Sequence, residues 1–238
     1  PLDRSGMCNL VEGKRVLITG AGGSIGSELV RQFCDFTPQS LTLIDNSEFA
    51  LYTIYLDVAQ KWPSLNREAV ITNVRDQDRI QSVICDLSPE LVFHAAALKH
   101  VPLVEANICE GLATNVIGTR NVANACVEFG VKTMVVVSTD KAINPTSVMG
   151  ASKRLAEIYC QALDLDTNKA TDTRFVTVRF GNVLGSTGSV VPLFQKQLSV
   201  GGPLTVTHPD MTRYFMTVRE AVELILQSAT LSMSLIPI

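Results

Sequence analysis

The sequence predicts an α/β fold, a doubly wound parallel sheet with helices on both faces. Short runs rich in β-branched residues alternate along the chain with longer segments that mix apolar and charged residues. The short runs are mostly apolar rather than alternating, as strands buried on both faces of a parallel sheet are. Such alternation of strand and helix is typical of βαβ units. The 238 residues, 46% of them apolar and 18% charged, are enough for one large domain with a sizeable core.

Six strands are expected, at residues 15–19, 40–44, 69–73, 91–94, 133–138 and 175–179. Helical length and mixed apolar and charged faces predict helices at residues 25–36, 76–87, 116–129 and 147–163. After about residue 181 Gly, Pro and Ser become more frequent, the strands become irregular, and one more helix is expected at 218–231. We interpret this last part as a smaller, substrate-facing region that grows from the carboxyl edge of the sheet.

Composition and charge argue against several classes of protein. The net charge is −3 and there is no long basic run, so nucleic acid is not expected as the main partner. The six cysteines are scattered without a C-x-x-C pair, as thiols in a reducing compartment are, and the three histidines lack metal-ligand spacing, so no metal is expected. No apolar run has membrane-spanning length and no signal peptide is visible, so we expect a cytoplasmic chain that makes no membrane contact itself.

A glycine-rich segment follows the first expected strand. Gly20, Gly23 and Gly26 have the spacing G-x-x-G-x-x-G, and a helix is expected to begin near Ser24. Glycine permits a tight turn and lets backbone amides approach a pyrophosphate, while the positive end of the helix points at the same charge. The position between a strand and a helix, near the start of a βαβ alternation, favours a dinucleotide site over an ordinary glycine-rich turn.

Asp45 closes the second expected strand. An acid at this place accepts hydrogen bonds from the adenosine ribose and repels a 2′-phosphate, so the sequence favours NAD over NADP as the cofactor. The alternative is that Asp45 only caps the helix that follows.

A set of short segments adds a family resemblance. They are TGAGGSIGSEL at 19–29, HAAALKHVP at 94–102, NVIGT at 115–119, STDKA at 138–142, MGASK at 149–153, RFGNV at 179–183 and MTRYFM at 211–216. Together they resemble the extended short-chain dehydrogenase/reductase superfamily, and more specifically the bacterial polysaccharide-biosynthesis branch that includes UDP-N-acetylglucosamine 4,6-dehydratases. The resemblance runs from about residue 13 to about residue 231.

The resemblance implies a Rossmann domain over residues 13–180 that binds NAD, and a substrate-binding region over residues 181–238. Residues 1–12 resemble the linker that joins this domain to a membrane-spanning part in larger members. Members continue beyond residue 231, so the substrate-binding region is expected to be C-terminally incomplete. Asn73 stands where the family usually has an aspartate that touches adenine, which we interpret as a conservative change. The residues implied in cofactor binding are Gly20, Gly23, Ser24, Ile25, Gly26, Asp45, Asn46, Asn73, Val74, Ala95, Ala96, Ala97 and Lys153.

The expected active-site helix lacks the tyrosine of the superfamily. No Y-x-x-x-K occurs in the chain, and Met149 stands four residues before Lys153, on the same helix face. Lys153 can keep the usual role of a cation at the nicotinamide ribose. Met149 cannot transfer a proton and is expected to fill the space of the tyrosine.

Proton transfer is therefore expected from the turn after the fifth strand, at the carboxyl edge where such sheets bind ligands. The resemblance implies that Thr139 hydrogen-bonds the C4 oxygen of a sugar and that Lys141 removes the C5 proton. Asp140 would protonate the C6 hydroxyl as it leaves and share in removing the C4 hydroxyl proton. The order of Asp140 and Lys141 can also be reversed, and a polar turn with a helix cap is the structural alternative for the segment.

Further residues are implied on the substrate side. Asn115 would begin a helix and organise a proton-relay water, or act only as an N-cap. Arg213 is the candidate for the substrate diphosphate, because a guanidinium matches phosphate geometry, and its alternative is a surface arginine. For His100, which also follows the fourth expected strand, a structural role is as plausible as a role in the active site. Substrate contacts are also implied for Lys99, Asn182, Ser189 and Val190.

The leading interpretation is an NAD-dependent 4,6-dehydratase of a UDP-hexose such as UDP-N-acetylglucosamine, acting in surface polysaccharide biosynthesis. A UDP-sugar 4-epimerase uses the same cofactor and the same oxidation at C4, but it normally needs the absent tyrosine. A non-catalytic NAD-binding fragment is the alternative from another class. The expected partners are a UDP-sugar and further copies of the chain, because sister enzymes pair through helices. A membrane anchor elsewhere in the full-length protein is compatible with the resemblance.

Overall fold

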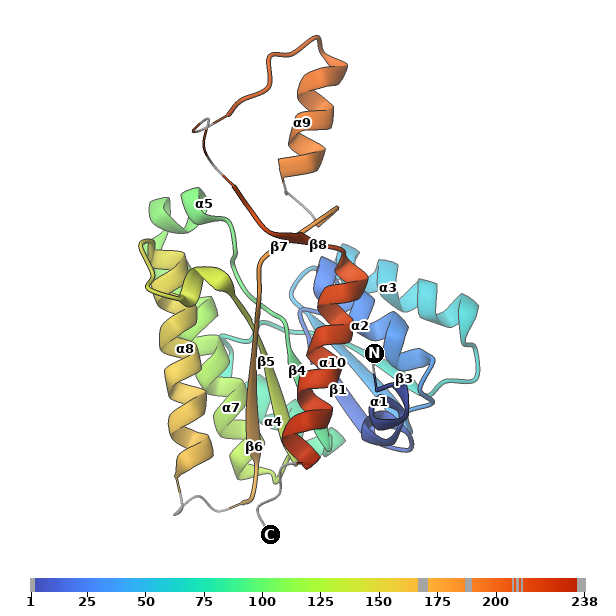
Figure 1. Cartoon of the computed structure of the whole chain (residues 1–238). Helices are drawn as coiled ribbons and strands as arrows, with labels where there is room; N and C mark the ends of the chain where they lie inside the picture. Colours follow the sequence, from blue (N-terminus) through green and yellow to red (C-terminus); the bar gives the residue numbers. More distant parts are fainter. Residues whose placement is uncertain are drawn as a thin grey trace.

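The computed structural model describes residues 3–166, 171–186, 190–206, 208, 210 and 212–234. A six-stranded parallel sheet lies between two layers of helices (Figure 1). Its strand order is β3-β2-β1-β4-β5-β6, so the direction of winding reverses between β1 and β4. This confirms the doubly wound fold and opens a crevice at the carboxyl ends of these two strands. The strands are β1 (Arg15–Thr19), β2 (Ser40–Asp45), β3 (Arg67–Ile71), β4 (Leu91–His94), β5 (Thr133–Thr139) and β6 (Arg174–Phe180).

Two hydrophobic cores lie on the two faces of the sheet. One core packs under α1 (Arg4–Val11), α2 (Ser24–Cys34), α3 (Glu48–Lys61) and α10 (Val218–Ser234). The other packs under α4 (Gln77–Leu87), α7 (Thr119–Glu128) and α8 (Val148–Leu165). Within β1, Val16 and Ile18 enter the first core and Leu17 enters the second. Because both faces are covered at the centre of the sheet, the inner strands β1, β4 and β5 are mostly apolar, as the sequence indicated, whereas the edge strands β3 and β6 carry exposed polar positions.

Side-chain caps fix where several of these helices begin. The hydroxyl of Ser147 accepts a hydrogen bond from the Gly150 amide at 3.1 Å, which starts α8 at Val148. Asp76 caps α4 in the same way. Helix α3, which was not predicted from the sequence, begins after Ser47 and buries one stripe of apolar residues against the first core.

The segment between β4 and α7 is more broken than expected. It contains α5 (Val101–Ala106), α6 (Ile108–Leu112) and a π-helical turn (Ala113–Gly118) that runs directly into α7. After β5, a single 3-10 turn (Asp140–Ala142) precedes α8. A π-helical turn inside a helix shifts the register of its side chains, and such turns are frequent at functional sites.

Both ends of the described chain fold onto the sheet, which corrects two expectations. Residues 1–12 were expected to be a linker, but Arg4–Val11 form α1, and its Met7, Leu10 and Val11 are buried in the first core beside α10. Helix α10 was expected in the substrate-binding region, but it packs against α2 and β6. The reason is that both helices carry an apolar stripe that only the open face of the sheet can bury. None of the helices in the described residues is both long and apolar enough to cross a membrane.

The part between β6 and α10 rises beyond the carboxyl ends of the strands (Figure 1). A short strand, β7 (Asn182–Val183), pairs in parallel with β8 (Phe215–Met216). Helix α9 (Val190–Ser199) has no buried residue and projects away from the body of the molecule. This part therefore stands over the edge of the sheet where the sequence places ligands.

Candidate active site

The phosphate loop lies between β1 and α2, where the strand order reverses. Gly20 has a φ of +69°, and a Cβ there would come within 2.6 Å of the backbone nitrogen of Ala96. A Cβ on Gly26 would collide with the carbonyl oxygen of Gly20. These two positions therefore require glycine, and they let the amino end of α2 sit directly against the loop, where its amides can hold an anion.

A cavity of about 680 Å³ extends from this loop across the carboxyl ends of β2 and β3. We call it the cofactor cavity. All the residues that the sequence implied in cofactor binding line it, with the exception of Lys153; they are Gly20, Gly23, Ser24, Ile25, Gly26, Asp45, Asn46, Asn73, Val74, Ala95, Ala96 and Ala97.

Asp45 organises the part of the cofactor cavity at the carboxyl end of β2. Its carboxylate accepts hydrogen bonds from the Gly22 amide and the Ser47 amide, each at 2.9 Å. It thus supports the phosphate loop, and the N-cap of α3 is Ser47 rather than Asp45. Arg31 also lines the cavity, but it is paired with Asp57 at 2.8 Å. A 2′-phosphate at this place would therefore meet a carboxylate and an arginine whose charge is already compensated.

The wall beside Asn73 is held by α7. The structure corrects the end of the third strand, because β3 stops at Ile71 and Asn73 lies in the loop after it. The Asn73 side-chain oxygen accepts a hydrogen bond from the Arg75 amide at 3.0 Å, and Asn121 of α7 donates to the Val74 carbonyl at 3.1 Å. This loop is therefore fixed before any ligand enters.

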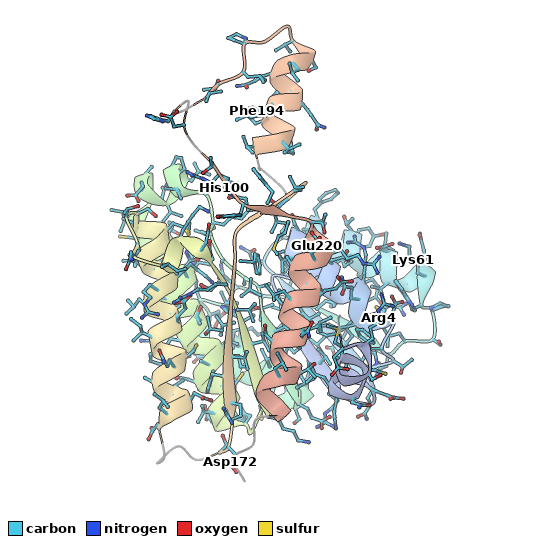
Figure 2. The ribbon with its side chains drawn as sticks, viewed as in Figure 1. Arg4, Lys61, His100, Asp172, Phe194 and Glu220 are labelled. Atoms are coloured by element: carbon cyan, nitrogen blue, oxygen red, sulfur yellow. The ribbon has the colours of Figure 1, made fainter. Side chains whose placement is uncertain are left out.

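A second cavity of about 440 Å³ adjoins the first one. We call it the catalytic cavity. The two cavities share Ala95, Ala97 and Lys99 among their lining residues, and His100, labelled in Figure 2 at the carboxyl end of the sheet, also lines both. Of the predicted catalytic and substrate residues, the structure brings together here Thr139, Lys141, Met149, Lys153, Lys99, Asn182, Val190 and Arg213. Ser189 lies outside the described residues.

Asp140 and Lys141 form an ion pair at the rim of the catalytic cavity. The Lys141 Nζ lies 3.1 Å from an Asp140 carboxylate oxygen and 3.4 Å from the side-chain oxygen of Asn182. Thr139 donates its hydroxyl to the same Asp140 oxygen at 2.9 Å. Burial alone would raise the pKa of Asp140, but the hydrogen bonds from Lys141 and Thr139 outweigh it, so the pKa lies below its usual range. Asp140 is therefore ionised in the free protein.

Met149 and Lys153 lie together on the buried face of α8, and both line the catalytic cavity. Burial lowers the pKa of Lys153 from 10.5 to about 8, and the neighbouring Cys160 and the carboxylate of Glu157 oppose this shift. Close to neutral pH the side chain is therefore mostly protonated, as a cation at a ribose must be. Met149 occupies the position four residues before it with an apolar side chain that can exchange no proton.

Asn115 does not begin a helix, which corrects our expectation. It lies inside the π-helical turn, fully buried, and lines neither cavity. Its side chain accepts from the Leu98 amide at 2.8 Å and donates to the Leu98 carbonyl and the Ser152 hydroxyl, each at 2.9 Å. Asn115 therefore ties the loop before α5 to α8, and its side chain is not an N-cap.

Two buried polar residues behind the cavities were not predicted from the sequence. His94 lies between Thr19 and Thr119 under the phosphate loop. Glu157 lies one turn after Lys153 and accepts a hydrogen bond from Ser138, next to Thr139. The sequence contained a signal for Glu157, because the spacing of four residues between Met149, Lys153 and Glu157 predicts that all three lie on one helix face. His94 gave no comparable signal.

The fold and cavities agree with a comparison to known protein families. A family model described as polysaccharide biosynthesis protein matches residues 16–234. The chain belongs to this family. For this polysaccharide biosynthesis family, the match extends over the whole sheet and over α10, so it includes every residue that lines the two cavities.

The curated relatives of the chain include a capsular polysaccharide biosynthesis protein, a 4,6-dehydratase and a 4-epimerase. The chain is 48% identical to the capsular polysaccharide biosynthesis protein CapD of Staphylococcus aureus, over 97% of this chain and 38% of that protein. It is 36% identical to an inverting UDP-N-acetylglucosamine 4,6-dehydratase of Campylobacter jejuni, over 90% of this chain and 63% of that protein. A UDP-glucose 4-epimerase of Rickettsia canadensis is also 36% identical, over 90% and 62%. The chain thus spans less than two thirds of each relative.

A solved structure gives a similar picture. The dTDP-glucose 4,6-dehydratase DesIV of Streptomyces venezuelae, with NAD bound, is 25% identical and superimposes with a TM-score of 0.76, covering 89% of this chain and 70% of that one.

Proposed function

We propose that the chain catalyses the NAD-dependent 4,6-dehydration of a UDP-hexose, with UDP-N-acetylglucosamine as the first candidate, in the biosynthesis of a surface polysaccharide. The observation that carries the proposal is the catalytic cavity, where Thr139, Lys141 and Lys153 meet around a methionine in place of a tyrosine. The similarity to a UDP-N-acetylglucosamine 4,6-dehydratase supports the same reaction class.

The cofactor cavity fits NAD. Its phosphate loop can pack tightly against β4 and α2 because Gly20 and Gly26 lack a Cβ, and Asp45 would face the unphosphorylated ribose of the cofactor. NAD, when bound, would accept a hydride from C4 of the sugar and return it to C6. Lys153, which lines the catalytic cavity, would hold the nicotinamide ribose.

The charge of the catalytic cavity favours a nucleotide diphosphate sugar. Among the described lining residues there is no carboxylate, whereas four side chains are basic: Lys99, Lys141, Lys153 and Arg213. A diphosphate would compensate these charges, with Arg213 best suited to bind it in a bidentate way.

The ion pair of Asp140 and Lys141 suggests an order for the proton transfers. Thr139 would hydrogen-bond the C4 oxygen while ionised Asp140 accepts the C4 hydroxyl proton as C4 is oxidised. Once Asp140 is protonated and no longer compensates it, the Lys141 ammonium would release a proton to solvent, and the resulting amine would remove the C5 proton, which the C4 ketone has made acidic. Protonated Asp140 would give its proton to the C6 oxygen, so that the C6–O bond breaks and water leaves. Lys141 would return a proton to C5. In the alternative assignment, Lys141 is the acid at C6 and Asp140 is the base at C5.

The test is incubation of the chain with NAD and UDP-N-acetylglucosamine in deuterated water, followed by mass spectrometry. The expected product has lost one water and carries deuterium at C5, because a protein base exchanges that proton. A C4 epimer without loss of water would instead support a UDP-sugar 4-epimerase, which is the named activity of one relative. Met149 makes this second function the weaker one, since it can exchange no proton at C4.

Replacement of Asp140 tests the acid directly. We expect Asp140→Asn to lower the rate of dehydration by about 100-fold or more, because an amide can neither accept nor donate the required proton. NAD affinity should stay unchanged, since Asp140 does not line the cofactor cavity. The matched control is Asp86→Asn on α4, where the exposed carboxylate accepts a hydrogen bond from Ser82 far from either cavity. Equal rates for the two variants would exclude Asp140 from the chemistry.

A further inference from the structure

Glu157 is a buried carboxylate behind the catalytic cavity that the proposed steps do not use. It follows Met149 and Lys153 at intervals of four residues on α8, and the exposed fractions of the three side chains are 3%, 5% and 3%. These intervals place all three on the helix face that packs against β5 and β6. Glu157 therefore lies directly behind Lys153, away from solvent.

The carboxylate is fully engaged by donors from three directions. It accepts the Ser138 hydroxyl at 2.5 Å, the Nε of Arg179 at 2.8 Å and an amino group of Arg154 at 3.2 Å. Burial alone would raise the pKa of Glu157, but the hydrogen bonds from Arg179, Ser138 and Arg154 outweigh it and keep the pKa below its usual range. Glu157 is thus a buried charge that its partners hold in the ionised form.

These contacts connect Glu157 to the strands that carry the reacting groups. Ser138 precedes Thr139 at the end of β5 and lines the catalytic cavity. Arg179 lies at the end of β6, three residues before Asn182. One carboxylate on α8 therefore fixes both strand ends relative to Lys153.

The surroundings of Lys153 are otherwise mainly basic, and the other nearby carboxylate, Asp140, is paired with Lys141 at the rim of the cavity. Helix α8 contributes Glu157 and Cys160, and the neighbouring strand β4 contributes neutral, buried His94. The remaining charged or titratable groups that line the catalytic cavity within the described chain are Lys99, His100, Lys141 and Arg213. Four basic side chains including Lys153 thus share one cavity, and the carboxylate that acts on Lys153 is that of Glu157, which the cavity does not expose.

We propose that Glu157 is a positioning residue of this site: its carboxylate orients Ser138 beside Thr139 and supplies the negative charge that keeps the Lys153 ammonium protonated. The inference rests on the proposed function insofar as Lys153 serves a bound dinucleotide. If the carboxylate is removed while Arg154 and Arg179 stay, Lys153 is left among uncompensated cations. Its ammonium should then lose its proton at a lower pH, and the site should lose its cation near neutrality.

The direct test uses the chain without cofactor. Lysine labelled with 13C at Cε is followed by NMR across pH, and the Lys153 signal is assigned by its absence in Lys153→Arg. In the wild type we expect titration near pH 8. In Glu157→Gln we expect the midpoint to fall by about one pH unit or more, because a nearby negative charge raises the pKa of a lysine and its removal lowers it. In the control Glu223→Gln, whose carboxylate pairs with Arg219 on α10, the midpoint should not move.

A second variant keeps the test decisive if Glu157→Gln does not fold. Arg179→Gln removes one of the cations that compensate Glu157, so the Lys153 midpoint should rise rather than fall. The inference is supported if the Lys153 midpoint falls in Glu157→Gln and rises in Arg179→Gln, or if only the rise in Arg179→Gln is observed. A general loss of packing would not shift the midpoint in opposite directions in the two variants. An unchanged midpoint in a folded variant would overturn it.

NAD affinity provides an independent readout. Measured by calorimetry at pH 8 and pH 6, the affinity of Glu157→Gln should be several-fold weaker than that of the wild type at pH 8, with a smaller difference at pH 6, where Lys153 is mostly protonated in both proteins. The conservative variant Glu157→Asp should restore part of it. If Lys153 shifts as expected but UDP-N-acetylglucosamine is not dehydrated, the proposed function fails and the role of Glu157 stands. If dehydration is normal but the Lys153 midpoint does not move, the role of Glu157 fails and the proposed function stands.

Discussion

At the scale of single residues, His94 shows how burial sets protonation. Thr119 donates its hydroxyl to the Asn115 carbonyl at 2.7 Å, so it accepts from the His94 Nε2 at 2.9 Å, and the Nδ1 accepts from Thr19 at 2.7 Å. Burial, followed by the positive charge of Lys153, lowers the pKa of His94 from 6.5 to about 3. The folded protein therefore holds this ring neutral, with one donor and one acceptor that each have a partner.

This protonation makes stability depend on pH with a definite sign. Below pH 6.5 His94 becomes protonated in the unfolded chain, whereas in the folded chain it stays neutral down to about pH 3. The free energy of unfolding therefore falls as pH decreases through this window. Between pH 7 and pH 5.5 the loss from this residue should be about 1 kcal/mol. Urea unfolding at the two pH values should show that His94→Gln lacks this part of the loss. The exposed control His208→Gln should retain it; an identical pH dependence of both variants would contradict the assignment.

At the scale of elements, the π-helical turn before α7 determines how α8, the helix that carries Lys153, is fixed to the rest of the site. The turn places Asn115 inside the protein, where its amide joins Leu98 to Ser152 of α8. Because Lys99 and His100 follow Leu98, this one side chain sets the spacing between the loop that lines both cavities and the helix that carries Lys153.

Loss of the Asn115 amide should therefore weaken both stability and the site. We expect Asn115→Ala to lower the free energy of unfolding by about 2–4 kcal/mol, since it leaves buried polar partners without hydrogen bonds. Asn107→Ala is the control, because the Asn107 amide donates to the Leu103 carbonyl at the exposed end of α5. Chemical denaturation measures both values, and a difference below about 1 kcal/mol would show that water replaces the Asn115 amide.

At the scale of the whole molecule, the two ends of the described chain close the sheet domain. Helix α10 covers the face of β5 and β6 beside α2, with α1 packed against it (Figure 1). Its buried residues Val222, Ile225, Leu226 and Ala229 belong to the same core as Phe33 of α2. Residues that follow the substrate-facing part in sequence thus stabilise the domain that holds the cofactor cavity.

A core substitution in α10 should therefore destabilise the whole domain. Leu226 is fully buried, so we expect Leu226→Ala to reduce the free energy of unfolding by about 2–5 kcal/mol. Leu224 is on the same helix but 39% exposed, and Leu224→Ala should cost about 1 kcal/mol or less. Thermal unfolding followed by circular dichroism compares them, and a local transition confined to α10 would mean that the helix is not part of the cooperative domain.

Patterns local in sequence were sufficient for the fold class and for much of the candidate site. The apolar runs of the strands, the glycine spacing and the interval between Met149 and Lys153 each express a rule that acts over a few residues. They predicted the parallel sheet, the phosphate loop with Asp45, and the shared helix face, whereas the other residues that line the cofactor cavity were implied by the family resemblance. They failed at the linker expected over residues 1–12, at Asn115 and at the omitted α3, where packing or helix register determined the outcome.

The sequence by itself determined the kind of fold, the place of the phosphate loop and the absence of a proton-transferring tyrosine before Lys153, because these depend on residue type and spacing. Only the tertiary structure decided the ionisation of Asp140, the neutrality of His94 and the place of Glu157 behind Lys153. Charge states depend on burial and on partners such as Arg179, which lies 22 residues from Glu157 along the chain. Distances of that kind are set when the strands and helices pack, and not by any local pattern.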